Sequence, residues 1–258
     1  NEGTGGDAHY ILVDDICLND EGGTLEWPVI AESASPDHPT YFRGVFDGNG
    51  RTIKNMYIAE YHTFSGLFGS TKGAVIKNLT VDDSRINGNG SFIVNWAENT
   101  DILNCSVTNC EFPNLVYSGS QGGIVGSFTA VYSEADTVFL KDCVSDFRLG
   151  EDAHLFYGGG VAGYACAENG FLIIENCVNY SNIEAQELAA GILGSGGGRS
   201  NTDNTGLIIR DCKNYGDIRA EHFCGGIVSY CWDIEVNRCF NRGNVTADSV
   251  AGGIAGTT

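Results

Sequence analysis

The stretch Cys177-Val-Asn-Tyr-Ser-Asn-Ile-Glu-Ala185, followed shortly by Gly191-Ile-Leu-Gly194, decides the fold because nearly the same letters occur three times. Further copies begin at Cys212 and Cys239, and in every copy the cysteine precedes the isoleucine of the Gly-Ile pair by 15 residues. Constant spacing of this kind indicates a repeat array, in which each repeat stacks on its neighbours. We therefore expect the 258 residues to form one elongated domain.

Two apolar patterns alternate along most of the chain. The first, a strand of the Gly-x-Gly type, is anchored by Leu67, Ile93, Ile124, Val161, Ile192, Ile227 and Ile254. The second strand of each coil centres on Met56, Leu79, Cys105, Cys143, Cys177, Cys212 and Cys239. Short strands, tight Gly and Asn turns and no helical period exclude helical and leucine-rich solenoids. The pattern predicts an all-β fold, a right-handed parallel β-helix (solenoid) of about seven to eight coils with an N-terminal cap.

We expect residues 1–40 to form an N-terminal lead and capping segment, and residues 41–258 to form the β-helix repeats. Residues 9–18 carry a β-branched strand that enters the stack, while residues 19–40 hold three of the four prolines and read as an extended cover. The sequence stops at Thr258, just after the opening strand of another coil. We therefore expect the C-terminal end to be truncated.

The formal net charge is −19, which repels nucleic-acid phosphates and anionic membrane surfaces. We expect no nucleic-acid partner. No apolar run approaches the length of about 20 residues that a transmembrane helix needs, so we expect no transmembrane segment. No EF-hand loop, calcium-binding nonapeptide or zinc-ligand spacing occurs. We expect no cofactor, although the scattered acidic residues leave calcium binding open.

Half of the ten cysteines occupy one equivalent position in successive repeats. These are Cys105, Cys143, Cys177, Cys212 and Cys239. Stacked strands would place their Cβ atoms about 4.8 Å apart with parallel directions, whereas a disulfide requires about 3.5–4.5 Å and a twisted dihedral angle. The pattern predicts a ladder of buried, reduced thiols. Any disulfide would then be found among Cys17, Cys110, Cys166, Cys224 and Cys231.

Candidate ligand contacts come first from three variable segments, residues 128–137, 164–170 and 195–206. They follow the Gly-Ile strand in consecutive coils, so we expect them to leave one corner of the solenoid and to form one surface. Tyr132, Tyr164 and Arg199 are its candidate contacts for a glycan or partner protein. A second corner carries Tyr117, Arg148, His154 and Tyr157. Solvated loops without a ligand are the alternative for both corners.

A second candidate contact is a column formed by Tyr180, Tyr215 and Arg242, each three residues after a ladder cysteine. Rungs about 4.8 Å apart suit offset ring stacking, and a guanidinium can lie on the terminal ring. An outward column would offer a platform for a sugar. Its alternative role is to shield strand edges and fix the register of the strands.

An enzyme is the main competing interpretation, because polysaccharide lyases and glycoside hydrolases also use β-helices. Their chemistry needs carboxylates brought together on one face. The adjacent pair Asp82-Asp83 would instead point to opposite faces of a strand. Asp142 and Asp211 share a rung position with Asn104 and Asn176, which favours a turn-capping ladder. No catalytic residue is predicted.

Gly66-Leu-Phe-Gly69, the later Gly-Gly-Ile strands and the leader Phe46-Asp-Gly-Asn-Gly-Arg-Thr-Ile-Lys-Asn-Met56 resemble the GLUG-type repeats of bacterial cell-surface proteins. Such repeats occur in adhesin-like proteins and beside the peptidase unit of some immunoglobulin A-cleaving metallopeptidases. The resemblance implies an exported, extracellular, cell-surface segment without catalytic activity. It would act in adhesion or as a stalk that presents loops to a glycan or host protein. We expect a monomer.

Overall fold

The computed structural model describes residues 8–32, 40–59, 64–114, 119–131, 137–150, 155–168, 170–198 and 206–257. Within these residues the chain forms 29 strands and no helix. The strands make three sheets whose neighbouring strands are parallel. The predicted all-β parallel β-helix is confirmed.

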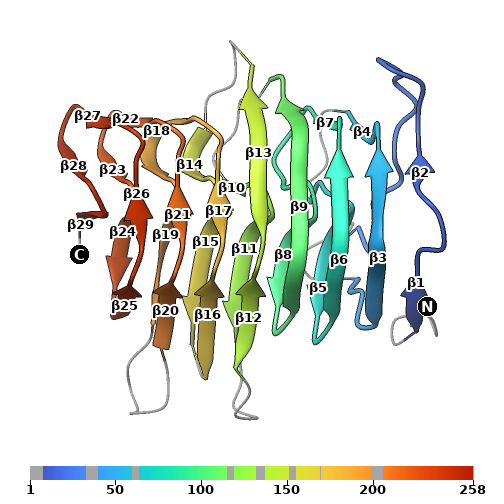
Figure 1. The fold of residues 1–258 in the computed structure, drawn as a ribbon, viewed down its shortest axis with the longest axis horizontal. Helices are drawn as coiled ribbons and strands as arrows, with labels where there is room; N and C mark the ends of the chain where they lie inside the picture. Colours follow the sequence, from blue (N-terminus) through green and yellow to red (C-terminus); the bar gives the residue numbers. More distant parts are fainter. Residues whose placement is uncertain are drawn as a thin grey trace.

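The largest sheet has 15 strands. They are β1 (His9–Ile11), β2 (Ile16–Cys17), β3 (Val45–Lys54), β4 (Tyr57–Ile58), β6 (Val75–Asp82), β7 (Arg85–Ile86), β9 (Asp101–Phe112), β12 (Val138–Lys141), β13 (Val144–Leu149), β16 (Phe171–Glu175), β17 (Val178–Asn179), β20 (Gly206–Arg210), β21 (Lys213–Asn214), β25 (Ile234–Asn237) and β26 (Phe240–Asn241). In Figure 1 these strands stand side by side along the long axis, from β1 near the N-terminus to β25 and β26 near the C-terminus.

Two further sheets have seven strands each. One contains β10 (Ser120–Gly122), β14 (Leu155–Gly159), β18 (Ile183–Ala190), β22 (Ile218–Ala220), β23 (Phe223–Gly225), β27 (Val245–Ala247) and β28 (Val250–Gly252). The other contains β5 (Phe68–Lys72), β8 (Val94–Glu98), β11 (Val125–Ala130), β15 (Ala162–Ala167), β19 (Leu193–Gly198), β24 (Val228–Trp232) and β29 (Ala255–Thr257). The seven strands of this last sheet and the bridge from Ile30 to Phe68 give eight rungs, in agreement with the predicted seven to eight coils.

The apolar anchors of the Gly-x-Gly strands form one column inside the solenoid. The residues that follow them pair in register from coil to coil, for example Phe68 with Val94 and Val94 with Val125. The first six anchors are fully buried, namely Leu67, Ile93, Ile124, Val161, Ile192 and Ile227. Ile254 is 39% exposed because it lies in the last coil and has no further coil against it. Removing these side chains from water is the main contribution of the stack to stability.

In six successive coils, one corner is made by a residue with a left-handed backbone. These residues are Asn78, Asn104, Asp142, Asn176, Asp211 and Arg238, with φ between 49° and 56°. Short Asn and Asp side chains tolerate this conformation because they bond locally. The amide Nδ2 of Asn104 donates to Asn78 Oδ1 (2.9 Å), and that of Asn176 donates to Asp142 Oδ1 (2.7 Å). The predicted turn position is confirmed, and its side chains bond in pairs between neighbouring coils.

The position predicted for Met56 in the second-strand column is wrong. Arg51, and not Met56, pairs with Leu79. Met56 lies one residue before Tyr57, which pairs with Arg85, so Met56 belongs to the next corner of the coil. At that corner, too, an Asn or Asp with positive φ precedes a buried residue. Its members are Asn55, Asp83 and Asn109.

The N-terminal segment belongs partly to the stack. Strands β1 and β2 pair with β3, as expected for residues 9–18. Farther along, the backbone N–H of Trp27 donates to Tyr57 O (2.8 Å), and that of Ile30 donates to Leu67 O (3.1 Å). Residues 9–30 therefore form an incomplete first coil. Pro36 and Pro39 lie outside the described residues, so the capping role stays a prediction.

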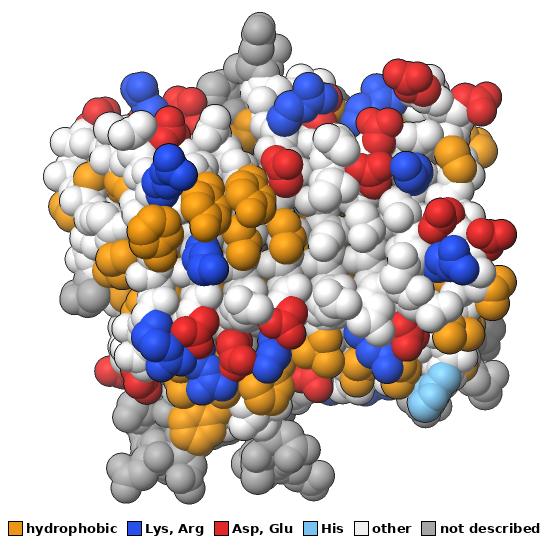
Figure 2. All heavy atoms as spheres, in the orientation of Figure 1, with side chains coloured by type: hydrophobic (Ala, Val, Ile, Leu, Met, Phe, Trp, Pro, Cys, Tyr) orange, Lys and Arg blue, Asp and Glu red, His pale blue; other side chains and the backbone are white. Residues whose placement is uncertain are grey.

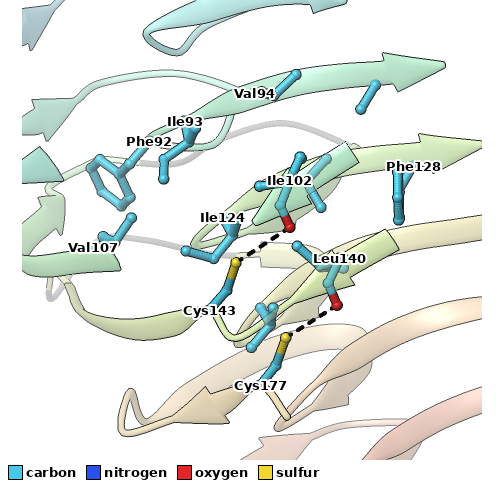
Figure 3. Packing of buried hydrophobic residues seen from close by; sticks show 14 of the residues in the cluster. Phe92, Ile93, Val94, Ile102, Val107, Ile124, Phe128, Leu140, Cys143 and Cys177 are labelled. Atoms are coloured by element: carbon cyan, nitrogen blue, oxygen red, sulfur yellow. Dashed lines mark hydrogen bonds between the residues drawn. The ribbon is translucent and has the colours of Figure 1, made fainter. Parts of the chain in front are cut away.

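The cysteine ladder lies where the repeat spacing places it. Val144 pairs with Ser106 and with Val178, so the cysteines just before these residues stack in register. Cys105, Cys143, Cys177 and Cys212 are fully buried, and Cys239 in the last coil is half-buried. Figure 3 shows the thiols of Cys143 and Cys177 pointing to the backbone of the preceding coil, where they donate to Ile102 O (3.7 Å) and Leu140 O (3.5 Å).

None of the ten cysteines forms a disulfide, including the five outside the ladder. Burial raises the pKa of the Cys143 and Cys177 thiols well above the ordinary value, and it raises the pKa of Cys110 to about 12. The thiols therefore stay protonated near neutral pH. They act as small apolar side chains with a weak S–H donor.

A second interior ladder consists of Asn179, Asn214 and Asn241. Asn179 Nδ2 donates to Asn214 Oδ1 and Asn214 Nδ2 donates to Asn241 Oδ1, both at 2.8 Å. The three amides also donate to the carbonyls of Ser181, Gly216 and Gly243. Sequence reasoning missed this ladder, although each copy of the repeat has Asn two residues after the cysteine.

Candidate functional site

A groove runs along the solenoid between the two seven-stranded sheets, with a volume of about 610 Å³. Strands β10, β14, β18 and β23 supply one wall, and strands β11, β15, β19 and β24 supply the other. Its lining residues are Ser120, Ser127, Tyr157, Tyr164, Glu187, Leu188, Ser195, Phe223 and Tyr230. Concave surfaces with aromatic walls and a few polar groups are the usual form of ligand sites.

Strand register builds each wall as a column of side chains. The first column runs Ser120, Tyr157, Leu188 and Phe223, one residue from each coil. The second runs Ser127, Tyr164, Ser195 and Tyr230. Within every coil the two members are seven residues apart, on either side of the Gly-Ile turn. This constant offset is the signal by which the sequence could have revealed the groove.

The aromatic rings of the groove support one another. The centroids of Phe223 and Tyr230 are 6.3 Å apart, and those of Tyr230 and Trp232 are 6.0 Å apart. Tyr157 packs edge-on against Phe156 at 4.6 Å. Tyr230 is 43% exposed, so part of its ring is open to a ligand. Such contacts hold the rings in place before binding, which lowers the entropy cost of association.

The polar groups of the groove are mainly neutral hydroxyls. Glu187 is the one acid among the nine lining residues, and its Oε2 lies 3.7 Å from His222 Nδ1. Across the described residues, no three His, Cys, Asp or Glu side chains come together as metal ligands. The site offers apolar ring surface and hydroxyl hydrogen bonds, with a single carboxylate at its edge.

The loop surface predicted from residues 128–137, 164–170 and 195–206 requires a correction. Tyr164 lies in strand β15 and Phe128 lies in β11, while β19 includes Ser195. These residues continue the sheet because they pair in register with neighbouring coils. Tyr164 contributes to the groove from a strand and not from a loop. Tyr132 and Arg199 lie outside the described residues.

The second predicted corner separates in the structure. Arg148 lies in β13 and pairs with Glu111 of the preceding coil (3.7 Å). Tyr157 lies in β14 and lines the groove. Tyr117 and His154 lie outside the described residues.

The tyrosine column is present. The rings of Tyr180 and Tyr215 stack with centroids 5.2 Å apart and planes 9° from parallel. Arg242 follows in the column, since its backbone N–H donates to Asn214 O (2.9 Å). The cation–π contacts of the described residues do not include Arg242, and the predicted guanidinium contact with the terminal ring is wrong. Phe240, from the same strand face, meets the Tyr215 ring instead, at 6.2 Å and 60°.

The fold is a parallel β-helix, and the aromatic groove runs along one edge of it. Among solved structures, the chain is similar to a crystal structure from Bacteroides ovatus described as "a putative immunoglobulin A1 protease". The TM-score is 0.71 at 21% identity, over 96% of this chain and 73% of the other. This likeness supports the fold. No family model matches the chain, and no curated protein matches it either. No described helix has the length and apolarity to cross a lipid bilayer.

Proposed function

We propose that this chain is a non-catalytic segment of an exported bacterial cell-surface protein that binds a glycan in the aromatic groove. The observation that carries the proposal is the pair of facing columns, which combine Tyr157, Tyr164, Phe223 and Tyr230 with serine hydroxyls. Binding would serve adhesion, or would let a stalk present this surface to its environment.

The chemistry of the groove suits a sugar chain. A sugar ring has an apolar C–H face, which packs on an aromatic ring, and a rim of hydroxyls, which bond to Ser and Tyr hydroxyls. Successive coils repeat every ~4.8 Å, so a linear glycan along the axis would meet a new pair of wall residues at each rung. The length of the groove across four coils favours an oligosaccharide over a single sugar.

The same groove gives little support to hydrolysis. Glycosidases use two carboxyl groups that flank the bond to be broken, and Glu187 is the one acid among the lining residues that the structure describes. A polysaccharide lyase or glycoside hydrolase is the competing interpretation. Turnover of a bound glycan distinguishes it from the binding function.

The surface location rests on the resemblance to GLUG-type repeats and on the charge of −19. A strongly negative charge keeps a repeat array soluble and resists association with other anionic surfaces. Detection of the protein on intact bacterial cells with a labelled antibody, set against its amount in lysed cells, tests this part of the proposal.

A glycan array probed with the labelled chain tests the binding function. Among neutral oligosaccharides, we expect the wild-type chain to select a small set, and Tyr230→Ala to lose this set. Tyr215→Ala is the matched control for these neutral sugars, because it removes an exposed ring outside the groove. The absence of any bound oligosaccharide, or equal binding by Tyr230→Ala, would overturn the proposal.

A further inference from the structure

A separate surface lies on the outer face of β13, β17, β21 and β26. Figure 2 shows hydrophobic side chains gathered over these strands, with basic side chains beside them. Tyr180, Tyr215 and Phe240 are 52%, 37% and 49% exposed. Exposed aromatic groups that cluster in this way are unusual on a soluble protein and mark interaction sites.

Register arranges this surface as a regular array of two columns and three coils. One column holds Val178, Lys213 and Phe240. The other holds Tyr180, Tyr215 and Arg242, each two residues farther along the same strand face. Lys213 and Arg242 therefore lie diagonally across neighbouring coils, with Tyr215 and Phe240 on the other diagonal. Long side chains at diagonal positions of a parallel sheet are within reach of one ligand.

Neither cation of the array forms an ion pair with a carboxylate of the described residues. Most other Lys and Arg side chains of the described residues form ion pairs, for example Lys141 with Glu175 and Arg238 with Asp211. Among these described residues, no carboxylate lies within 4 Å of the Lys213 ammonium or the Arg242 guanidinium, as the ion pairs show. On a chain of net charge −19, two unpaired cations beside aromatic rings form a local site for an anion.

Among the nearby acids, Asp211 interacts electrostatically with Lys213 but already forms an ion pair with Arg238, and Asp217 is hydrogen-bonded to Asn244. Asp211 accepts from Arg238 Nε (2.7 Å) and Nη2 (2.6 Å). Asp217 Oδ1 accepts from the backbone N–H of Asn244 (2.8 Å) and from its Nδ2 (3.0 Å). Asp146 is exposed next to Ser145, whose carbonyl accepts from the N–H of Tyr180, at the opposite end of the column from Arg242. Positive charge is therefore concentrated at one end of the array, at Lys213 and Arg242.

We propose that this array, which we call the basic aromatic face, binds a hexuronate residue of an acidic polysaccharide. The carboxylate would lie between Lys213 and Arg242, and the apolar face of the sugar would pack against the neighbouring aromatic side chains. A guanidinium and an ammonium both form charge-assisted hydrogen bonds to a carboxylate. This site shares no residue with the neutral-glycan groove, whose lining in the same coil begins at Glu187, seven residues after Tyr180.

Titration calorimetry with oligogalacturonate and with a neutral galactose oligomer of equal length tests the proposal. We expect saturable binding of the acidic oligomer alone, weakened at least tenfold by 0.5 M salt because screening shortens the reach of exposed charges. Lys213→Met and Arg242→Met keep the apolar stems, and each should weaken binding about tenfold. Arg219→Met removes a cation that is also exposed but pairs with Glu184 (3.6 Å), and this variant should bind as the wild type does.

Three outcomes would overturn this proposal. They are equal affinity for the neutral oligomer, unchanged affinity in both Met variants, and equally tight binding of a glutamate-rich peptide through the same two cations. Tyr230→Ala separates the two sites, since it should abolish binding in the groove and leave oligogalacturonate binding intact. Loss of binding in the groove can therefore be distinguished from loss of binding at the basic aromatic face.

Discussion

Gly191 lies directly against the side chain of Asn214 in the next coil, so that a Cβ on Gly191 would come within 2.3 Å of Asn214 Cγ. The same contact recurs between Gly160 and Asn179 and between Gly226 and Asn241. The interior asparagine ladder therefore explains why glycine precedes the anchor in the Gly-Ile motif. Each coil leaves out a side chain where its neighbour inserts an amide.

Gly191→Ala should destabilise the protein by about 3 kcal/mol or more, because a rigid backbone and a bonded amide must both move. Gly253 provides the matched control. It occupies the same motif position in the last coil, and no atom lies within 4 Å of the place for its Cβ. Urea denaturation should show a large loss of stability for Gly191→Ala and little change for Gly253→Ala. Equal effects would contradict the ladder contact.

The thiols should divide into classes when a thiol-reactive reagent is added to the native protein. We expect fast labelling of exposed Cys17, slower labelling of half-buried Cys239, and labelling of the eight buried cysteines only after denaturation. The raised pKa of the ladder thiols reinforces this protection, since the thiolate is the reactive form. Peptide mapping by mass spectrometry identifies the labelled sites. Rapid native labelling of Cys143 or Cys177 would refute their burial.

Substitutions at Cys177 should report on the apolar interior around the ladder. Cys177→Val keeps the apolar character and adds only one heavy atom to the side chain, and we expect a change within about 1 kcal/mol. Cys177→Asp would place a carboxylate in a fully buried site, and we expect a loss of several kcal/mol, about 3–5. Chemical denaturation of both variants measures the difference. A Val variant as unstable as the Asp variant would show that the weak thiol hydrogen bonds matter more than packing.

Acid should weaken the ion pairs that Glu175 forms with Lys141 and Arg210 of the neighbouring coils. The Lys141 ammonium (2.8 Å) and the Arg210 guanidinium (Nε at 2.7 Å) hold the pKa of Glu175 below its usual value. Because the folded-state pKa is depressed, this carboxylate stabilises the fold above the unfolded pKa, near 4.5, and the contribution is lost as pH falls through the folded-state value.

The urea midpoint of the wild type should therefore fall below about pH 5, and Glu175→Gln should show a shallower fall. Glu184→Gln is the control, since Glu184 is 71% exposed and faces Arg219 at 3.6 Å. Its profile should follow the wild type. Parallel profiles for all three proteins would show that the Glu175 ion pairs contribute nothing measurable.

The repeat spacing predicted most of the fold, because stacking residues must recur in every coil. The cysteine ladder, the Gly-Ile anchors and the Tyr180–Tyr215 stack all follow from one alignment of three copies. The alignment is wrong at Met56 for two reasons. Both corners of the coil place an Asn or Asp before a buried residue, and the bulge between Asp47 and Arg51 shifts the register. Local sequence cannot distinguish two corners that satisfy the same backbone requirement.

The groove was harder to predict, because ligand-facing positions are free to change from coil to coil. Ser120, Tyr157, Leu188 and Phe223 share a column but no side-chain chemistry, so no repeated letter marks it. The sequence predicts Tyr164 as a contact residue, and Tyr164 does line the groove. The prediction places it in a loop, whereas the structure places it in strand β15. The repeat alignment does not predict Phe240 as the partner of Tyr215, because Arg242 and not Phe240 occupies the equivalent repeat position.

The most direct test of the account measures binding and turnover by the groove in the same sample. An oligosaccharide selected on the glycan array is titrated into the wild type and into Tyr230→Ala, with Tyr215→Ala as the control, and each mixture is then analysed for products by chromatography. We predict saturable binding by the wild type and the control, at least tenfold weaker binding by Tyr230→Ala, and an intact oligosaccharide throughout. Cleaved products in the wild-type sample, or equal affinity in all three proteins, would contradict a binding groove without catalysis.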